Sequence, residues 1–422
     1  MTANRNPSPL IPIFITVFLD MLGIGIIIPV IPALFFAADS DFFAPEVTRE
    51  FRSVTYGLLL ASYPFMQFFG APLLGSLSDR FGRKPLLTVS LFGTMLGYLL
   101  FAYAIYSGRL WLLFVSRMLP GFTGGNIAIV YSAIADVSDE KSRPKNFGLV
   151  GMSFGLGFIL GPTLGGILAD ESVVPWFNAA TPFLFTAGLT LLNILLVRAR
   201  FKETLLKSRH TPLNPFQGFR NVAGSFRSPR LRVIFSVVLL LSLGFAFFTQ
   251  FFSVLLIEKF SYAEKDIGFL YAWIGVWLVF TQGFIVRRLS KVVAPATVLS
   301  FGILSLSIWI GAVLLPDRDV WFYFINPLIA MSQGVISPNL TTVVSMQAGP
   351  ERQGEVLGIN QSMLSLGQIV PPLLAGYLNT ISGSLPMAAG AFLVFCGWVV
   401  FVFIFKKQQA RMGQNAAGQP VG

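Results

Sequence analysis

The chain has 422 residues, of which 54% are hydrophobic and only 12% are charged. Soluble domains carry about 25% charged residues, so this composition excludes a soluble globule. The mean hydropathy of +0.72, with 43 Phe and 40 Gly, also excludes coiled coils, disordered chains and collagen-like repeats. The apolar runs are continuous and near 20 residues long rather than alternating, which excludes an outer-membrane barrel.

The remaining class is an all-α integral membrane protein with twelve transmembrane helices, at about 20 apolar residues for each crossing. Most Lys and Arg fall in segments on one side, so the positive-inside rule places both termini in the cytoplasm. We expect a multi-pass protein of the plasma (inner) membrane without a cleavable signal, because its first apolar run is too long for one. The predicted spans are 10–35, 53–75, 86–106, 110–134, 146–168, 178–198, 231–256, 266–286, 295–315, 320–345, 355–378 and 386–405.

Several functions find no support in the residues. The net charge of +11 is spread over short loops rather than gathered on one face, so no nucleic-acid partner is predicted. His210 is the only histidine and Cys396 the only cysteine, and no paired carboxylates or phosphate-binding loop accompany them. We therefore predict no enzyme, no cofactor and no metal site.

An internal repeat divides the chain into two halves. Gly148, Gly157 and Pro162 of the fifth span match Gly358, Gly367 and Pro372 of the eleventh at one constant offset. Parallel repeats of six helices predict a substrate site near the bilayer midplane and alternating access by rocking. The expected parts are an N-terminal bundle at 1–198, a basic linker at 199–230, a C-terminal bundle at 231–406 and a cytoplasmic tail at 407–422.

The loop after the second span resembles a known signature. It reads GSLSDRFGRKP and matches the loop motif of the major facilitator superfamily. Glycine permits close approach of helices, the carboxylate can accept hydrogen bonds from arginine, and the basic residues anchor the loop inside. These residues are predicted to form a conformational latch: Gly75, Asp79, Arg80, Gly82, Arg83 and Lys84.

Further stretches refine this resemblance. The fifth span resembles the antiporter motif of drug/proton exporters and is expected to provide close helix packing through Gly151, Gly155, Gly161, Pro162, Gly165 and Gly166. The first span, LDMLGIGIIIPVIPAL, and the stretch ERQGEVLG resemble tetracycline/proton antiporters. Those proteins carry acidic residues in spans 3 and 9, whereas 86–106 and 295–315 hold none. The substrate is therefore left open.

Two ionisable side chains are predicted deep in the membrane. Asp20 lies in the first span and Arg117 in the fourth, at depths that would let their side chains meet. Such residues are costly in hydrocarbon and usually serve a function. An apolar cavity would favour the protonated form of Asp20, and an approaching Arg117 or cationic substrate would release the proton. We expect Asp20 to carry protons with Arg117 as its partner, although a static ion pair is an alternative.

Polar residues at helical spacing suggest the cavity wall. Candidate substrate contacts are Tyr63, Gln67, Gln250, Gln282, Gln333, Gln361 and Gln368. Hydrogen bonds between helices explain such residues equally well. The seventh span could present an apolar face that binds drugs or contacts lipid, formed by Phe247, Phe248, Phe251 and Phe252.

Together these features predict a monomeric, proton-coupled exporter of amphiphilic drug-like molecules, with small-molecule substrate, protons and membrane lipid as partners. Two alternatives stay open. One is a facilitator or importer of a small metabolite such as a sugar, in which Asp20 binds substrate. The other is a receptor or scaffold derived from a transporter.

Overall fold

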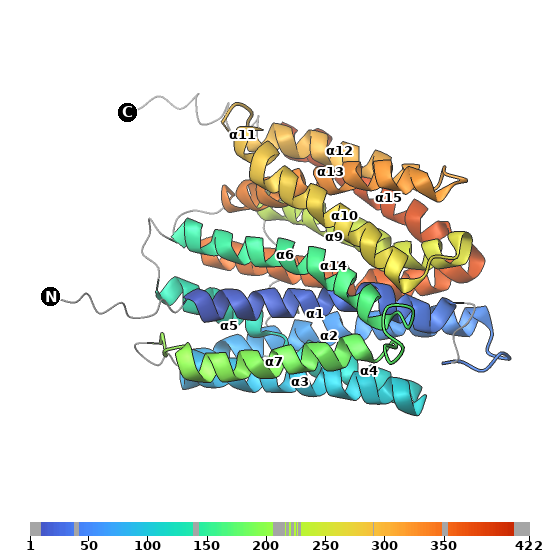
Figure 1. Ribbon diagram of the computed structural model, residues 1–422. Helices are drawn as coiled ribbons and strands as arrows, with labels where there is room; N and C mark the ends of the chain where they lie inside the picture. Colours follow the sequence, from blue (N-terminus) through green and yellow to red (C-terminus); the bar gives the residue numbers. More distant parts are fainter. Residues whose placement is uncertain are drawn as a thin grey trace, which may run out of the picture. The chain divides into compact units, whose positions relative to one another are not determined.

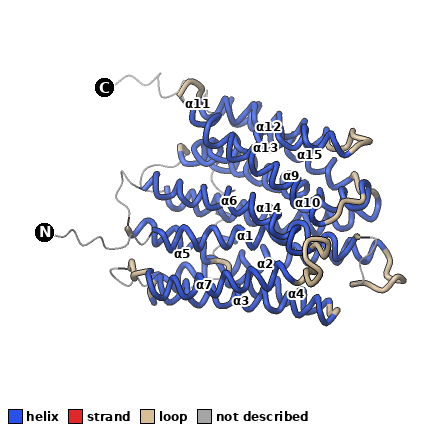
Figure 2. Tube along the Cα trace, in the orientation of Figure 1, coloured by secondary structure: helices blue, strands red, loops and turns tan. Residues whose placement is uncertain are grey.

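The computed structural model describes residues 10–37, 42–137, 143–205, 216, 219–220, 223–224, 226, 229–289, 291–347 and 353–408. Within these ranges every regular element is a helix (Figures 1 and 2). Nine of the described helices are long and apolar enough to cross a membrane. The all-helical membrane class is thus confirmed, whereas the count of twelve spans stays a prediction. Most of the predicted linker, with His210, and the tail from 409 lie outside the described residues.

The helices follow the predicted spans closely, because each span is a continuous apolar run bounded by polar or turn-forming residues. Short π and 3-10 segments, η1 (Thr281–Val286), η2 (Asp319–Trp321) and η4 (Val400–Phe405), extend three of them. The α-helices are α1 (Leu10–Phe36), α2 (Arg49–Phe81), α3 (Arg83–Ser107), α4 (Leu110–Thr123), α5 (Asn126–Asp136), α6 (Arg143–Ala169), α7 (Thr181–Arg200), α9 (Pro229–Phe260), α10 (Glu264–Phe280), α11 (Arg287–Leu289), α12 (Pro295–Ala312), α13 (Phe322–Ser345), α14 (Gln353–Ile381) and α15 (Leu385–Val399).

The helices form two compact units. The first consists of Met1–Gln217 and Ser253–Gly275, and the second of Gly218–Phe252 and Val276–Gly422. Helices α9 and α10 therefore contribute to both units. The hairpin that joins them packs with the first unit, although the sequence assigns it to the C-terminal bundle. The predicted domain boundaries describe the proposed duplication and stay a hypothesis.

Helix α6 lies against α1 in the first unit, and glycines make this contact possible (Figure 1). A Cβ on Gly161 would stand 2.7 Å from the Gly25 Cα atom, and one on Gly165 would stand 2.6 Å from the Ile26 carbonyl oxygen. Gly155 and Pro162 are buried in the same helix, Gly166 packs against the start of α10, and the burial of Gly151 is not described. These glycines thus lie where helices approach closely, and the role of the motif in the transport cycle stays a prediction.

Gly161→Ala should therefore destabilise the protein by about 1–3 kcal/mol, because the added methyl group meets backbone that cannot move aside. Thermal unfolding in detergent measures the effect. Gly188→Ala in α7 is the matched control, since nothing lies within 4 Å of the point that a Cβ atom would occupy there. Equal melting temperatures for the two variants would contradict the packing role of Gly161.

The four phenylalanines of α9 face neither lipid nor an open cavity. Phe247, Phe248, Phe251 and Phe252 are at most 3% exposed. In the second unit, the ring of Phe252 stacks on Phe248 and meets the ring of Phe322 in α13 edge to face, at 5.5 Å between centroids. Both alternatives drawn from the sequence are wrong here, because neighbouring helices cover this face of α9.

Candidate functional site

The predicted span 110–134 is interrupted in the structure, which corrects the expectation of one continuous helix. Helix α4 ends at Thr123, and α5 begins at Asn126 after two glycines. The Gly124 N–H donates to the Pro120 carbonyl oxygen at 2.6 Å. Proline removes one helical N–H and glycine lowers helix stability, so the sequence Pro120 to Gly125 explains the break.

Neighbouring side chains satisfy the backbone groups that the break frees. Gln67 in α2 donates through Nε2 to the Gly124 carbonyl oxygen at 3.3 Å, and the Ser90 hydroxyl in α3 donates to the Thr123 carbonyl oxygen. A Cβ on Gly124 would stand 2.8 Å from the Tyr63 hydroxyl oxygen. Broken helices are tolerated in membranes where protein groups or water in a cavity supply such hydrogen bonds. Tyr63 and Gln67, both predicted site residues, thus meet at the break.

Asp20 lies beside this break. It occupies the middle of apolar α1 and keeps partial exposure, and Asn126 donates through Nδ2 to its Oδ2 at 2.6 Å. Asn126 is only 2% exposed and is the first residue of α5. A helix amino terminus favours negative charge, and half-helices in transporters place such ends at the substrate depth. Apolar α1 therefore stabilises the neutral form of Asp20, and the Asn126 amide and the amino terminus of α5 stabilise its charged form.

Arg117 is not the partner of Asp20 in this structure, contrary to the pairing considered from the sequence. Its guanidinium lies over the ring of Tyr63, with Cζ 4.7 Å from the centroid, and the residue is 8% exposed. No described residue forms a hydrogen bond or an ion pair with this guanidinium, and its buried Nε has no partner. Tyr63 and Tyr98 lie within electrostatic range of both charges. The first unit thus gathers Asp20, Arg117, Tyr63, Gln67, Tyr98 and Asn126 into one cluster, called here the break cluster.

The five predicted glutamines belong to the second unit. Gln282 and Gln368 are exposed and Gln250 and Gln333 partly exposed, while the side chain of Gln361 lies outside the described part. Their role in binding substrate stays a prediction.

The loop between α2 and α3 forms a network of charges around the buried guanidinium of Arg83. Arg83 is 3% exposed and binds Asp79 through Nη2 at 2.6 Å, Asp136 through Nε at 3.1 Å and the Ser78 hydroxyl through Nη1 at 2.6 Å. Gly82 has a φ of +104°, which only glycine adopts readily. The predicted acceptor role of Asp79 agrees with this geometry. Of the other predicted latch residues, Arg80 lies over the ring of Phe81, Lys84 donates to the Arg198 carbonyl oxygen, and the Gly75 carbonyl oxygen accepts from Ser78.

Glu203, for which the sequence predicted no role, completes this network from the segment after α7. Its carboxylate accepts hydrogen bonds from the backbone N–H groups of Arg83, Lys84, Thr204 and Leu205. Partial burial opposes the charge of Glu203, but these hydrogen bonds outweigh it and hold the pKa of the carboxyl below its ordinary value of 4.5. A cap formed by a residue 120 positions away leaves no local sequence signal.

The depressed pKa of Glu203 predicts a pH dependence of stability. The folded protein stabilises the charged form of Glu203. The contribution of this carboxylate to the free energy of unfolding is therefore complete above about pH 4.5 and is lost as the pH falls through the pKa of Glu203 in the folded state. Glu203→Gln should cost about 1 kcal/mol at neutral pH, as the loss of a helix cap does. Melting temperatures at pH 7 and pH 4 test this, and the difference between wild type and variant should shrink in acid. A constant difference would contradict it.

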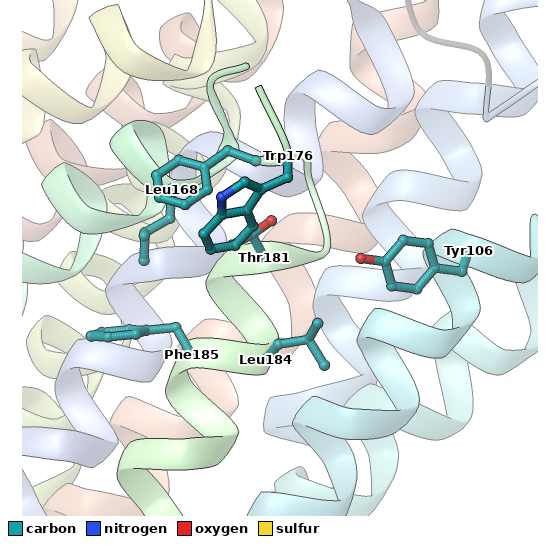
Figure 3. A pocket seen from close by; sticks show the side chains of 7 residues that line it. Tyr106, Leu168, Trp176, Thr181, Leu184 and Phe185 are labelled. Atoms are coloured by element: carbon teal, nitrogen blue, oxygen red, sulfur yellow. The ribbon is translucent and has the colours of Figure 1, made fainter. Parts of the chain in front are cut away.

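A separate pocket of about 410 Å³ opens at the ends of α3, α6 and α7 (Figure 3). No predicted site residue lines it. Trp176 and Tyr106 at its rim are 68% and 60% exposed, as is typical of aromatic residues at a membrane surface. Its lining consists of Tyr106, Leu168, Trp176, Phe177, Thr181, Leu184 and Phe185. The residues described here also contain no group of three potential metal ligands.

Comparison with known proteins connects this architecture to a family. Residues 13–372 match the family model of the Major Facilitator Superfamily. This chain belongs to that superfamily. This chain is 33% identical over 390 residues to tetracycline resistance protein class H of Pasteurella multocida. The match covers 89% of this chain and 90% of the relative. The resemblance to the tetracycline-resistance group is thereby confirmed, and the chain is a multi-pass membrane transporter rather than an enzyme.

Two solved structures share its fold. The human organic anion transporter MFSD10 (TETRAN) superposes with a TM-score of 0.70 at 22% identity, covering 94% of this chain and 100% of that one. A D-xylose-proton symporter superposes with a TM-score of 0.74 at 14% identity, covering 94% and 97%. At these identities the likeness establishes the superfamily fold and leaves substrate and direction open.

Proposed function

We propose that this transporter exports amphiphilic, drug-like molecules in exchange for protons by alternating access, with Asp20 as the proton carrier. The observation that carries the proposal is the carboxyl of Asp20, a partly exposed residue in the middle of apolar α1, bound by Asn126 at the broken helix. An ionisable residue at this depth is expensive unless it is used. The likeness to tetracycline-resistance proteins supports drug export.

The surroundings of Asp20 suggest how it exchanges protons. Apolar α1 favours the neutral carboxyl, whereas the Asn126 amide and the amino terminus of α5 favour the carboxylate. The two tendencies oppose each other, so a modest change nearby can load or release the proton. A cationic group of the substrate, or an approach of Arg117, would favour release. Protons and substrate would then occupy the site in turn, which is the requirement for exchange.

We place the protein in the plasma (inner) membrane as a monomer in contact with lipid, with both termini in the cytoplasm. Tyr63 and Gln67 would contact substrate from the first unit, and the five glutamines would contribute from the second. Arg83 and its carboxylates would form the conformational latch.

Alternating access further predicts that the hairpin between α9 and α10 must detach from the rest of the first unit. Arg49 binds Glu258 in this hairpin through two hydrogen bonds of 2.9 and 2.7 Å, and Lys265 binds Asp170 at 3.3 Å. Hydrogen bonds from Ser172 and then the interaction with Lys265 hold the pKa of Asp170 below its ordinary value, so Asp170 is charged at neutral pH.

Arg49→Cys combined with Glu258→Cys, in a Cys396→Ala background, should let a bis-methanethiosulfonate reagent cross-link the two positions, because its spacer replaces the length of the two side chains that meet here. Cross-linking is expected to reduce transport at least tenfold and cleavage by a reducing agent to restore it, because the cross-linked hairpin could not move. Each single cysteine variant is the control. Full transport by the cross-linked protein would show that this contact does not open during the cycle.

The function itself is tested in proteoliposomes with an imposed pH gradient and a panel of cationic, zwitterionic and neutral amphiphiles, tetracycline among them. An antiporter should accumulate its substrate when the lumen is acidic, because outward proton movement drives uptake. Accumulation of substrate only when the exterior is acidic would indicate a symporter. Equilibration of substrate that does not depend on the pH gradient in either direction would indicate a facilitator. Either outcome would overturn the proposal. Symport is worth testing because a D-xylose-proton symporter has the same fold.

A further inference from the structure

The break cluster contains a buried cation, Arg117, with which no described side chain forms an ion pair or a hydrogen bond. Arg117 contacts the face of the Tyr63 ring, and no described carboxylate or hydrogen-bond acceptor reaches its guanidinium. Arg83, in the same unit, shows how this chain treats an arginine buried for structural reasons. It gives Arg83 two carboxylates and a hydroxyl. Arg117 differs from Arg83 in having none of these partners.

An unpaired charge of this kind is costly. Removing a guanidinium from water is costly unless an opposite charge is supplied in good geometry. The aromatic face of Tyr63 offsets only part of this cost. Because no described carboxylate pairs with this guanidinium, the site is suited to an anionic group of a bound molecule. The planar fork of arginine matches a carboxylate or a similar anionic group.

Asp20 presents the opposite charge in the same cluster. Its described partner is the neutral amide of Asn126 at 2.6 Å, and none of the described basic residues forms an ion pair with it. Tyr63 and Tyr98 lie within electrostatic range of both charges. The cluster therefore offers one place for a cation and one for an anion, with aromatic surface close to both.

We infer that the transported molecule is a zwitterionic amphiphile, whose cationic group binds at Asp20 and whose anionic group binds at Arg117. The inference rests on the proposed proton exchange. A purely anionic substrate would favour protonated Asp20 and would travel with the proton rather than against it. A pure cation would leave Arg117 unpaired and be repelled by it. A molecule with both charges displaces the proton from Asp20 and supplies the anion that Arg117 lacks.

Three fluorescent probes on one scaffold test this inference. Nε-dansyl-lysine is zwitterionic, its methyl ester is cationic and its Nα-acetyl derivative is anionic. Binding of each is measured by dansyl fluorescence with the full chain in a neutral maltoside detergent. Wild type should bind the zwitterion at least tenfold more tightly than either derivative. Arg117→Gln should abolish the preference over the ester, and Asp20→Asn the preference over the acetylated probe.

Two further variants separate specific from structural effects. Arg109→Gln makes the same change at an exposed residue before α4 and should preserve both preferences. Arg117→Lys keeps the charge without the fork and should retain part of the preference over the ester, which keeps the test valid if Arg117→Gln does not fold.

Equal affinity of wild type for zwitterion and ester would overturn the inference, as would a preference that survives in Arg117→Gln. Phosphatidylethanolamine carries the same pair of charges, so it is added as a competitor. Displacement of the probe by this lipid would assign the site to a headgroup and also overturn the inference.

Failure of the zwitterion inference can be distinguished from failure of the proposed proton exchange. If the protein exchanges the methyl ester for protons but does not prefer the zwitterion, the zwitterion inference is wrong and proton antiport stands. If probe binding depends on Arg117 but no protons move, proton antiport is wrong and the zwitterion inference stands.

Discussion

Asp20→Asn is expected to abolish substrate accumulation driven by a pH gradient, reducing it at least tenfold to the level of liposomes without protein. Asparagine matches the shape of the carboxyl group but cannot carry a proton. The hydrogen bond from Asn126 can be kept, because the side-chain oxygen of the new residue still accepts it. The protein should therefore fold and exchange labelled for unlabelled substrate without a gradient. Accumulation and exchange are both measured in proteoliposomes.

Asp317→Asn is the matched control, since this carboxyl is exposed and lies outside the helices. It should leave accumulation unchanged. If Asp20→Asn still accumulated substrate in response to the gradient, another group would carry the proton, and the role assigned to the break cluster would be wrong.

Arg83→Gln should be the most destabilising single change in the loop between α2 and α3, at about 3–5 kcal/mol. The Arg83 side chain is only 4% exposed, and its loss leaves Asp79 and Asp136, each 24% exposed, without the cation that they share. Water reaches both carboxylates, so the effect lies at the lower end of this range. These partners lie in α2 and α5, so the loss affects contacts among at least three helices. The effect is read as a lower melting temperature in detergent.

Arg83→Lys should recover only part of this loss, because a single ammonium group cannot reproduce the separate contacts that three guanidinium nitrogens make with Asp79, Asp136 and Ser78. Arg80→Gln provides the control, since Arg80 is exposed and lies over Phe81. Equal melting temperatures for Arg83→Gln and Arg80→Gln would contradict the account of this network.

The sequence predicted the positions of the helices well, because long apolar runs between charged loops mark where a chain can enter and leave a membrane. It did not predict that 110–134 is broken. Pro120 and two glycines were visible there, yet such residues also occur in continuous transmembrane helices, where neighbours satisfy the backbone. Which outcome occurs depends on partners such as Gln67, and those are set by the fold.

The break cluster could be predicted in part. Asp20 and Arg117 stand out because ionisable residues are rare in apolar spans, and Tyr63 and Gln67 stand out by helical spacing. Asn126 was missed because a neutral amide in a membrane helix is usually a packing residue. Its role depends on the position at the start of α5, which is evident only once the break is known. The same limit applies to Glu203, whose four backbone partners lie at the start of α3 and just beyond its own position.

The most direct test of proton exchange uses proteoliposomes loaded with substrate and an internal pH dye, with equal pH on both sides. They are diluted into buffer without substrate, so that the substrate gradient alone drives transport. The account predicts acidification of the lumen as substrate leaves, because each departing molecule draws protons inward, and it predicts no pH change with Asp20→Asn. Alkalinisation of the lumen, or substrate efflux without any pH change in the wild type, would contradict it.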